Sequence, residues 1–155
     1  MQVTSMMTIL PEMTRAEMEQ LLAEERVGRV GLNDDPQPYI VPTDFAYLGG
    51  VIYIHTPAAG RKARLARSNP HVCFEVDRYN STVTDFQSII IRGRITEVSS
   101  PDERRKAMQM LAEKAARSGG VIPHGKSPGN SARIAIFKID IGDMTGIKSP
   151  ANGHP

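Results

Sequence analysis

The sequence predicts a mainly β fold, an antiparallel barrel of about six strands with two to three helices at its sides. Most apolar segments are short and alternate with polar residues, as strands with one buried face do. They follow one another through turns rich in glycine, proline and aspartate, rather than through the long helices of β-α-β units. A closed or partly closed barrel also leaves few exposed strand edges in a chain of 155 residues.

The first predicted element is a helix that begins at Thr14. Thr14 and Glu17 form the S/T-x-x-E capping pattern, in which each side chain accepts a hydrogen bond from a free backbone N–H at the start of the helix. Met18 and Leu22 belong to its apolar stripe, and we expect Gly28 to end it.

Three strands follow, predicted at residues 29–33, 39–47 and 51–56. A turn rich in aspartate and proline separates the first two, and Gly49-Gly50 makes the hairpin turn before the third. Pro42 interrupts the second strand, and proline cannot donate a ladder hydrogen bond. This strand is therefore expected at an edge, at a bulge, or where another group approaches the backbone.

The second half contains two helices and three strands, predicted at residues 61–68 (helix), 72–77 (strand), 88–99 (strand), 101–117 (helix) and 133–141 (strand). Asn69-Pro70 ends the short helix, and Ser100 caps the long one with a proline at the next position. Gly93 is expected to mark a bulge or a point of close packing. The buried face of the long helix is expected to carry Ala107, Met108, Leu111, Ala112 and Ala115.

Length and composition indicate a single domain over residues 1–155, with its core at about 13–149 and flexible ends. The net charge of +2 is too small to indicate nucleic-acid or membrane-surface binding. The apolar runs are far shorter than the ~18 residues of a membrane span, and the first residues show no secretory pattern. One cysteine allows no intrachain disulfide, which fits a cytoplasmic protein.

Common catalytic motifs are absent from the sequence: no P-loop, no G-x-G-x-x-G and no G-x-S-x-G. The four histidines have no metal-ligand spacing, so we expect no metal site. Cys73 lies within an apolar strand pattern and is expected to be a buried, inert thiol. No catalytic residue can be named from these patterns.

The most informative segment, residues 53–65, combines a strand end, a loop of small residues and a basic helix start. Free N–H groups and the positive end of the helix dipole meet there with His55, Thr56, Arg61 and Lys62. This combination predicts a phosphate-binding site. The alternative that the local pattern leaves open is a solvated basic face.

A second candidate wall for a ligand is the proline-interrupted strand, where Val41, Pro42 and Thr43 expose backbone donors and acceptors. A flat aromatic ring system with polar edges would suit such a wall. The simpler alternative, an edge strand protected by proline, is favoured by this pattern taken alone.

Seven blocks of the sequence, in this order and spacing, resemble the pyridoxamine-phosphate-oxidase-like FMN-binding split-barrel superfamily. The blocks are GRVG (28–31), PYIVPTDF (38–45), IYIHT (52–56), GRK (60–62), NPHVCFEVD (69–77), SIIIRGR (88–94) and MTGIKS (144–149). The chain is most similar to the branch related to the 5-nitroimidazole-resistance proteins. The likeness extends over about residues 13–149.

The resemblance implies a split barrel that forms a homodimer with FMN at the subunit interface. The cofactor-binding residues that it implies are Arg61, Lys62, Thr56 and His55 for the phosphate, the backbone of Val41, Pro42 and Thr43 for the isoalloxazine, and a polar contact from Ser88. The segment 77–85 and the loop around His124 could close the site. True pyridoxamine phosphate oxidases carry a further arginine-rich substrate site near the C-terminus, which the MTGIKS block does not provide, so vitamin B6 oxidation is not expected.

The function expected from the resemblance is an FMN-dependent oxidoreductase, nitroreductase-like, that acts on a small molecule. Three alternatives stay open at this point: a non-catalytic flavin-binding or storage protein, a relative that uses haem or a deazaflavin, and, more weakly, a nucleic-acid-binding barrel. His55 could make a phosphate contact or a structural contact, contact substrate, or transfer a proton.

Overall fold

The computed structural model describes residues 9–119 and 133–151, which form three helices and seven strands. The helices are α1 (Arg15–Glu24), α2 (Arg61–Ser68) and α3 (Pro101–Arg117). The strands are β1 (Val27–Asp34), β2 (Gln37–Asp44), β3 (Ala46–Leu48), β4 (Val51–Pro57), β5 (His71–Tyr79), β6 (Phe86–Glu97) and β7 (Ile134–Lys148). Within the described residues, no helix has both the length and the apolar character needed to cross a membrane.

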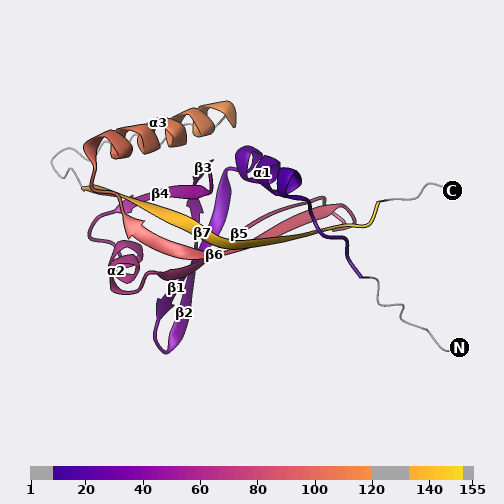
Figure 1. Ribbon diagram of the computed structural model, residues 1–155, viewed down its shortest axis with the longest axis horizontal. Helices are drawn as coiled ribbons and strands as arrows, with labels where there is room; N and C mark the ends of the chain where they lie inside the picture. Colours follow the sequence, from indigo (N-terminus) through magenta and orange to yellow (C-terminus); the bar gives the residue numbers. More distant parts are fainter. Residues whose placement is uncertain (1–8, 120–132, 152–155) are drawn as a thin grey trace, which may run out of the picture.

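All seven strands belong to one antiparallel sheet in the order β2-β1-β5-β6-β7-β4-β3. Strands β2 and β3 stand at opposite ends of this order, although only Phe45 separates them in the chain. The two edges of the sheet must therefore return to each other, and β2 also contacts β4. The sheet curls into a partly closed barrel (Figure 1), which confirms the predicted mainly β split-barrel class.

The seventh strand arises because the segment 39–47, predicted as one strand, is two. The break lies at Phe45, whose side chain is buried edge-on against Phe74 with ring centroids 5.2 Å apart. The backbone N–H of Phe45 donates to the carbonyl of Arg26 at 3.3 Å. This buried ring fixes the point at which the chain leaves β1 and turns to pair with β4.

Gly28 does not end the first helix, which stops at Glu24, but lies inside β1. A Cβ atom at this position would overlap the ring of Phe74, so the glycine allows close packing within the barrel. Gly93 likewise permits close packing, because a Cβ there would overlap the carbonyl oxygen of Asp140. The β6–β7 register shifts at Gly93 and leaves Gly142 as the additional residue of β7, so the strand continues beyond its predicted end at 141.

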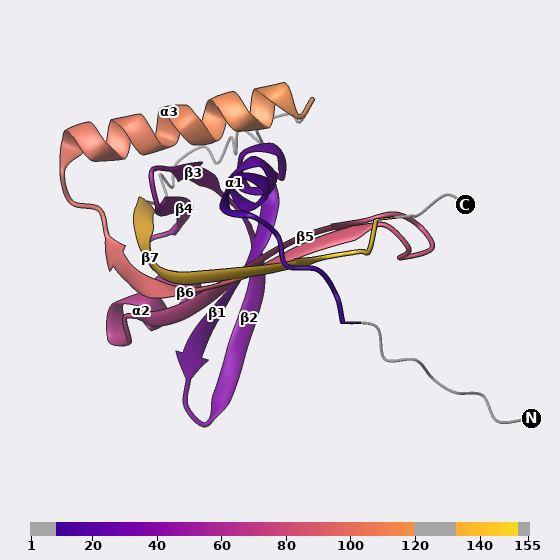
Figure 2. The ribbon, with the colours of Figure 1, turned by 45° about the vertical axis from the view of Figure 1, so that its right-hand side comes forward.

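The helices cover different sides of the barrel. In Figures 1 and 2, α3 runs along one side above β3 and β4 with α1 beside it, whereas α2 lies on the other side near β1 and β6. Ala63, Leu65 and Ala66 of α2 are buried in the main core. The position of α2 therefore depends on the apolar side of a helix whose other side is basic.

The buried face of α3 matches the prediction at Ala107, Leu111 and Ala115, but it also contains Lys114. Of the other two residues predicted on this face, Met108 is exposed and Ala112 is half-buried. The Lys114 ammonium donates to the carbonyl of Leu22, in the last turn of α1, at 2.8 Å. It also stands 3.7 Å from the centre of the Phe45 ring. Lys114 thus ties α3 to the end of α1 and to the barrel core.

The prediction of a buried thiol at Cys73 is wrong, because its side chain is exposed. Alternate residues of β5 point to opposite faces, and Val72 and Phe74 take the buried face. Cys73 therefore lies on the outward face, in register with Gly31 of β1 and Arg92 of β6.

Stability should depend on pH through Lys114. Burial lowers the pKa of Lys114 from 10.5 to about 8 in the folded protein. Between these values the unfolded chain binds more protons than the folded one. The free energy of unfolding should therefore rise with pH in this window, by up to about 1.4 kcal/mol per pH unit. Urea denaturation measures the free energy of unfolding of the wild type and of Lys114→Met at about pH 7 and about pH 9.5. Relative to the variant, the wild type should have a higher free energy of unfolding at the higher pH than at the lower one. A difference independent of pH would contradict the lowered pKa.

Candidate functional site

Three segments meet at one end of the barrel: the end of β4, the start of α2, and β2. A tight turn over residues 57–60, in which the N–H of Gly60 donates to the carbonyl of Pro57 at 3.1 Å, leads from β4 directly into α2. His55 and Thr56 at the strand end are thus placed near Arg61 and Lys62 at the helix start. Thr56 is buried and His55 is half-buried.

The start of α2 has no side-chain cap. Gly60 occupies the N-cap position, and the first turn contains no acidic residue. By contrast, Thr14 caps α1 and Ser100 caps α3, and both helices carry acidic residues in the first turn. Two cations, Arg61 and Lys62, instead stand at the positive end of the α2 dipole, where an anion would be stabilised.

Lys62 and His55 share a partly buried environment with one carboxylate, that of Asp44. Burial lowers the pKa of Lys62, and Asp44 partly opposes this effect. Burial also lowers the pKa of His55, Asp44 acts against it, and the positive charge of Lys62 lowers it further. A bound anion would favour the charged form of both groups, so the pair is suited to hold a phosphate.

Arg61 faces another way from Lys62. Its guanidinium forms an ion pair with Asp34 and lies 4.5 Å from the centre of the Tyr39 ring, both in the β1–β2 hairpin. Arg67, at the far end of α2, pairs with Glu97. The basic residues of α2 therefore do not form one uniform solvated face, and the helix start lies alongside β2, from Tyr39 to Asp44.

Strand β2 is an edge strand of the described sheet, as its proline predicts. Val41 and Thr43 face the interior, and Thr43 is 8% exposed. Pro42 is exposed and lies in register with Arg29 on the outward face. Among the described residues, no strand pairs with the side of β2 that faces away from β1. The backbone N–H and C=O groups on that side therefore have no strand partner.

A pocket of about 170 Å³ adjoins His55. Residues from five separate parts of the sequence line it: Arg26, Asp44, His55, Met108, Leu111, Ala112, Ala115 and Ile134. Arg26 and Asp44 form an ion pair of 3.4 Å at its polar side. Sequence reasoning assigned no role to these two residues, because only the fold brings the end of β2 beside the segment that precedes β1. The pocket is smaller than the roughly 300–1,000 Å³ usual for small-molecule sites.

Ser88 is not brought to this end of the barrel. It stands in register with Asp77 of β5 and Ile147 of β7. Arg94, which pairs with His71 just after α2, is six residues further along β6, and six residues of a strand span about 20 Å. Within a single chain, Ser88 therefore lies far from the other predicted site residues.

The remaining candidates contribute little to the site within one chain. The segment 77–85 ends β5 and forms the turn before β6, in which the Asn80 side chain accepts from the N–H groups of Thr84 and Asp85. His124 lies outside the described residues. Residues 9–119 and 133–151 contain no cluster of three or more histidine, cysteine or acidic side chains that could hold a metal ion.

Several known proteins are similar to this chain. An uncharacterized protein of Rhizobium meliloti (strain 1021) is 28% identical over 140 residues, which is 86% of this chain and 91% of the relative. The crystal structure of an FAD-binding protein from Mesorhizobium loti has a TM-score of 0.73 at 26% identity, and the match covers 92% of this chain and all of that one. A candidate 5-nitroimidazole antibiotic resistance protein from Bacteroides thetaiotaomicron shares the fold, with a TM-score of 0.69 at 18% identity over 89% of this chain and 86% of that one.

The family described as pyridoxamine 5'-phosphate oxidase matches residues 14–148. The match extends from the capping threonine of α1 to the last residue of β7 and so includes every helix and strand described above. The chain belongs to this pyridoxamine 5'-phosphate oxidase family.

Proposed function

We propose that this protein binds FMN and serves as an FMN-dependent oxidoreductase, nitroreductase-like, that acts on a small molecule. The observation that carries the proposal is the start of α2, which has no side-chain cap and no acidic residue, and where Lys62 stands near His55. Membership of the family and the likeness to an FAD-binding protein support a flavin as the bound group.

The groups at the helix start fit the terminal phosphate of FMN. The N–H groups of the first turn and the ammonium of Lys62 are donors, and the hydroxyl of Thr56 and the imidazole of His55 stand on the strand just before them. Hydrogen bonds from charged donors to a phosphate are stronger than neutral ones. The dianion would also offset the positive charge that Arg61 and Lys62 add to the helix dipole.

The open edge of β2 would hold the ring system of the flavin. Val41, Pro42 and Thr43 offer backbone N–H and C=O groups, except the N–H that proline lacks, along a strand that runs beside the start of α2. A flavin ring has polar atoms along its edge, so a row of backbone donors and acceptors can fix its orientation.

The flavin would supply the electron transfer, and the protein would bind it, orient it and control the protons near it. Burial lowers the pKa of His55, which favours the neutral imidazole, the form that can accept a proton. A nearby anion would raise that pKa, so the charge on His55 should follow occupation of the helix start.

We further propose that a second copy of the chain completes the site. Ser88 lies on the outward face with Ile90 and Ile147, which are 47% and 41% exposed. Pro42 lies on the same face, joined to Ile90 through the register Pro42–Arg29–Glu75–Ile90. A copy seated on this face would cover these apolar side chains and could bring its own Ser88 to the flavin. The small volume of the pocket in one chain also favours a site shared by two.

Substitution of Lys62 tests the phosphate assignment. Lys62→Gln should weaken FMN binding about 10- to 100-fold, because one hydrogen bond between charged groups contributes roughly 1.5–3 kcal/mol. Arg61→Gln should weaken it less, since Arg61 already pairs with Asp34, and the double variant should lose the flavin on purification. Titration of the apoprotein with FMN, followed by flavin fluorescence, measures these affinities.

Arg64→Gln is the matched control, because Arg64 is exposed on the same helix and the variant removes the same charge. Equal affinities for Lys62→Gln and Arg64→Gln would place the phosphate elsewhere.

The visible spectrum of the purified protein separates a flavin from haem. Turnover of NADH or NADPH with a nitroaromatic acceptor separates an enzyme from a flavin-storage protein.

Substitution of Ile90 tests the shared site. Ile90→Glu places a charge at the centre of the outward face and should convert a dimer to monomers with at least 10-fold weaker flavin binding. Sedimentation velocity measures the assembly, and Thr96→Glu, which adds a charge at another exposed position of β6, is the control. A wild-type protein that sediments as a monomer at all concentrations would exclude the dimer.

A further inference from the structure

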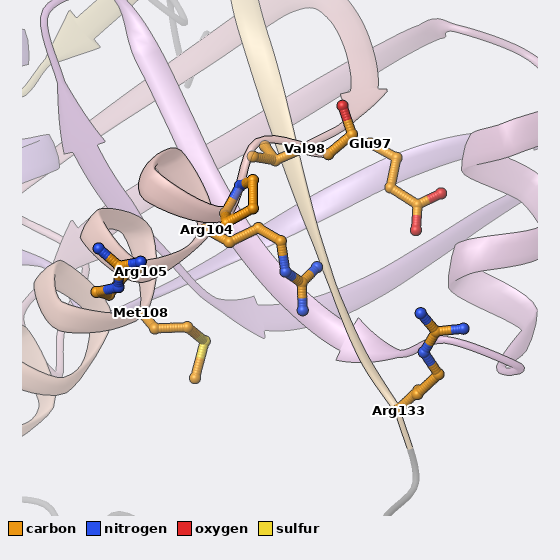
Figure 3. A pocket seen from close by; sticks show the side chains of 8 residues that line it. Glu97, Val98, Arg104, Arg105, Met108 and Arg133 are labelled. Carbon is orange, nitrogen blue, oxygen red and sulfur yellow. The ribbon is translucent and has the colours of Figure 1, made fainter.

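A second and larger pocket lies between the end of β6, the start of α3 and the residue that precedes β7 (Figure 3). Its volume is about 800 Å³. Three arginines and one glutamate line its polar side: Arg104, Arg105, Arg133 and Glu97. Its apolar side is lined by Val98, Pro101 and Met108. The pocket thus combines a surplus of guanidinium groups with an apolar wall.

Positive charge prevails in this pocket, although it already holds one carboxylate, that of Glu97. Arg67 donates to both carboxylate oxygens of Glu97, at 2.8 and 2.9 Å. The pKa of Glu97 is lowered, chiefly by Arg67 and also by the charges of Arg104 and Arg133. Glu97 thus shows that these guanidinium groups stabilise a carboxylate.

Arg104 and Arg133 have the capacity to bind a second carboxylate. In the described part of the chain no ion pair joins either of them to an acidic side chain, whereas Arg105 has an acidic partner at 3.1 Å. Arg104 donates through Nη2 to the carbonyl of Ile134 at 2.8 Å, which fixes the direction of its side chain. In Figure 3 the guanidinium of Arg104 points toward Glu97 and Arg133, while Arg105 is turned away.

One side of α3 connects this pocket with the pocket beside His55. Arg104, Met108 and Ala112 follow one another at intervals of four residues, so they lie along the same side of the helix. Met108 lines both pockets, which therefore adjoin at its side chain. Ile134, whose carbonyl holds Arg104, also lines the pocket beside His55. About one helical turn, roughly 5.4 Å, thus separates the arginine from the wall of the smaller pocket.

The pocket beside His55 has the size of a single ring. Its volume is about 170 Å³, and an apolar cavity of about 150 Å³ can hold benzene. The side that α3 and β7 contribute is apolar and includes Leu111, Ala112 and Ile134. One six-membered ring therefore fits there, with the arginines at one end and His55 at the other.

We propose that the protein binds an aromatic carboxylate, with its ring in the pocket beside His55 and its carboxylate held by Arg104 and Arg133. Guanidinium groups bind a carboxylate through pairs of charge-assisted hydrogen bonds. The ring would also cover the side chain of Met108, which is 39% exposed. That this ligand is the substrate rests on the proposed function, but that it binds does not.

Two compounds of nearly the same shape, 4-nitrobenzoate and 4-nitrobenzamide, test the recognition of the carboxylate. Isothermal titration of the wild type should show at least 10-fold tighter binding of 4-nitrobenzoate, because only this compound carries a negative charge. Arg104→Gln with Arg133→Gln should remove the preference. Arg133→Gln alone, outside any helix or strand, should remove part of it without affecting the fold. Lys106→Gln is the control, because it removes one charge from an exposed position of α3 that does not line the pocket.

Ala112→Leu tests the position of the ring, because it fills part of the pocket beside His55 and leucine is a good helix former. It should weaken the binding of both compounds and leave the preference for 4-nitrobenzoate unchanged. Unchanged affinities in this variant would place the ring elsewhere and overturn the proposal. So would equal affinity of the wild type for the two compounds, equal loss of preference in Lys106→Gln, or displacement of 4-nitrobenzoate by an equal concentration of inorganic phosphate.

Lys62→Gln separates this proposal from the flavin proposal, since it should weaken flavin binding and leave the binding of 4-nitrobenzoate intact. A protein that binds 4-nitrobenzoate in preference to the amide but binds no flavin would refute only the proposed function. A protein that binds flavin and shows no preference between the two compounds would refute only the present inference.

Discussion

The strongest constraint on this molecule is covalent: one residue, Phe45, connects the two opposite edges of the sheet. Neither edge can move far from the other, so the sheet must curl. This curl brings the end of β2 against β4 and places Asp44 beside His55. The buried contact between Phe45 and Phe74 holds the closure in place. The geometry of the candidate site follows from this closure rather than from any one loop.

Charge is the second organising factor, because the basic residues of α2 serve different surfaces. Arg61 contacts the β1–β2 hairpin, Lys62 lies near Asp44, and Arg67 pairs with Glu97 at the end of β6. The apolar side of the helix is fixed in the core, so these directions are set by its 3.6-residue period. The basic side chains of one short helix thereby contact three different parts of the barrel.

Much of the fold could be predicted because each strand carries a local signal: alternation, a turn, or a proline at an edge. The break at Phe45 could not, since the apolar pattern continues through it and only the tertiary contact with Phe74 reveals it. The burial of Lys114 was missed for the same reason, as its partners lie on α1 and the barrel. At the site, the sequence could indicate the contiguous residues around Lys62. Arg26 lines the pocket beside His55 only because the fold brings distant strands together, so the sequence could not indicate it.

Strand β7 lies between β6 and β4 in the sheet, although it follows all the other helices and strands of the described residues in sequence. Until β7 has left the ribosome, the β3–β4 hairpin has no neighbour on its other side. The pairing of His55 with Ile136 joins residues 81 positions apart, so closure must await contacts of long sequence separation. The pocket beside His55, which Ile134 of β7 helps to line, therefore forms only once β7 has joined the sheet.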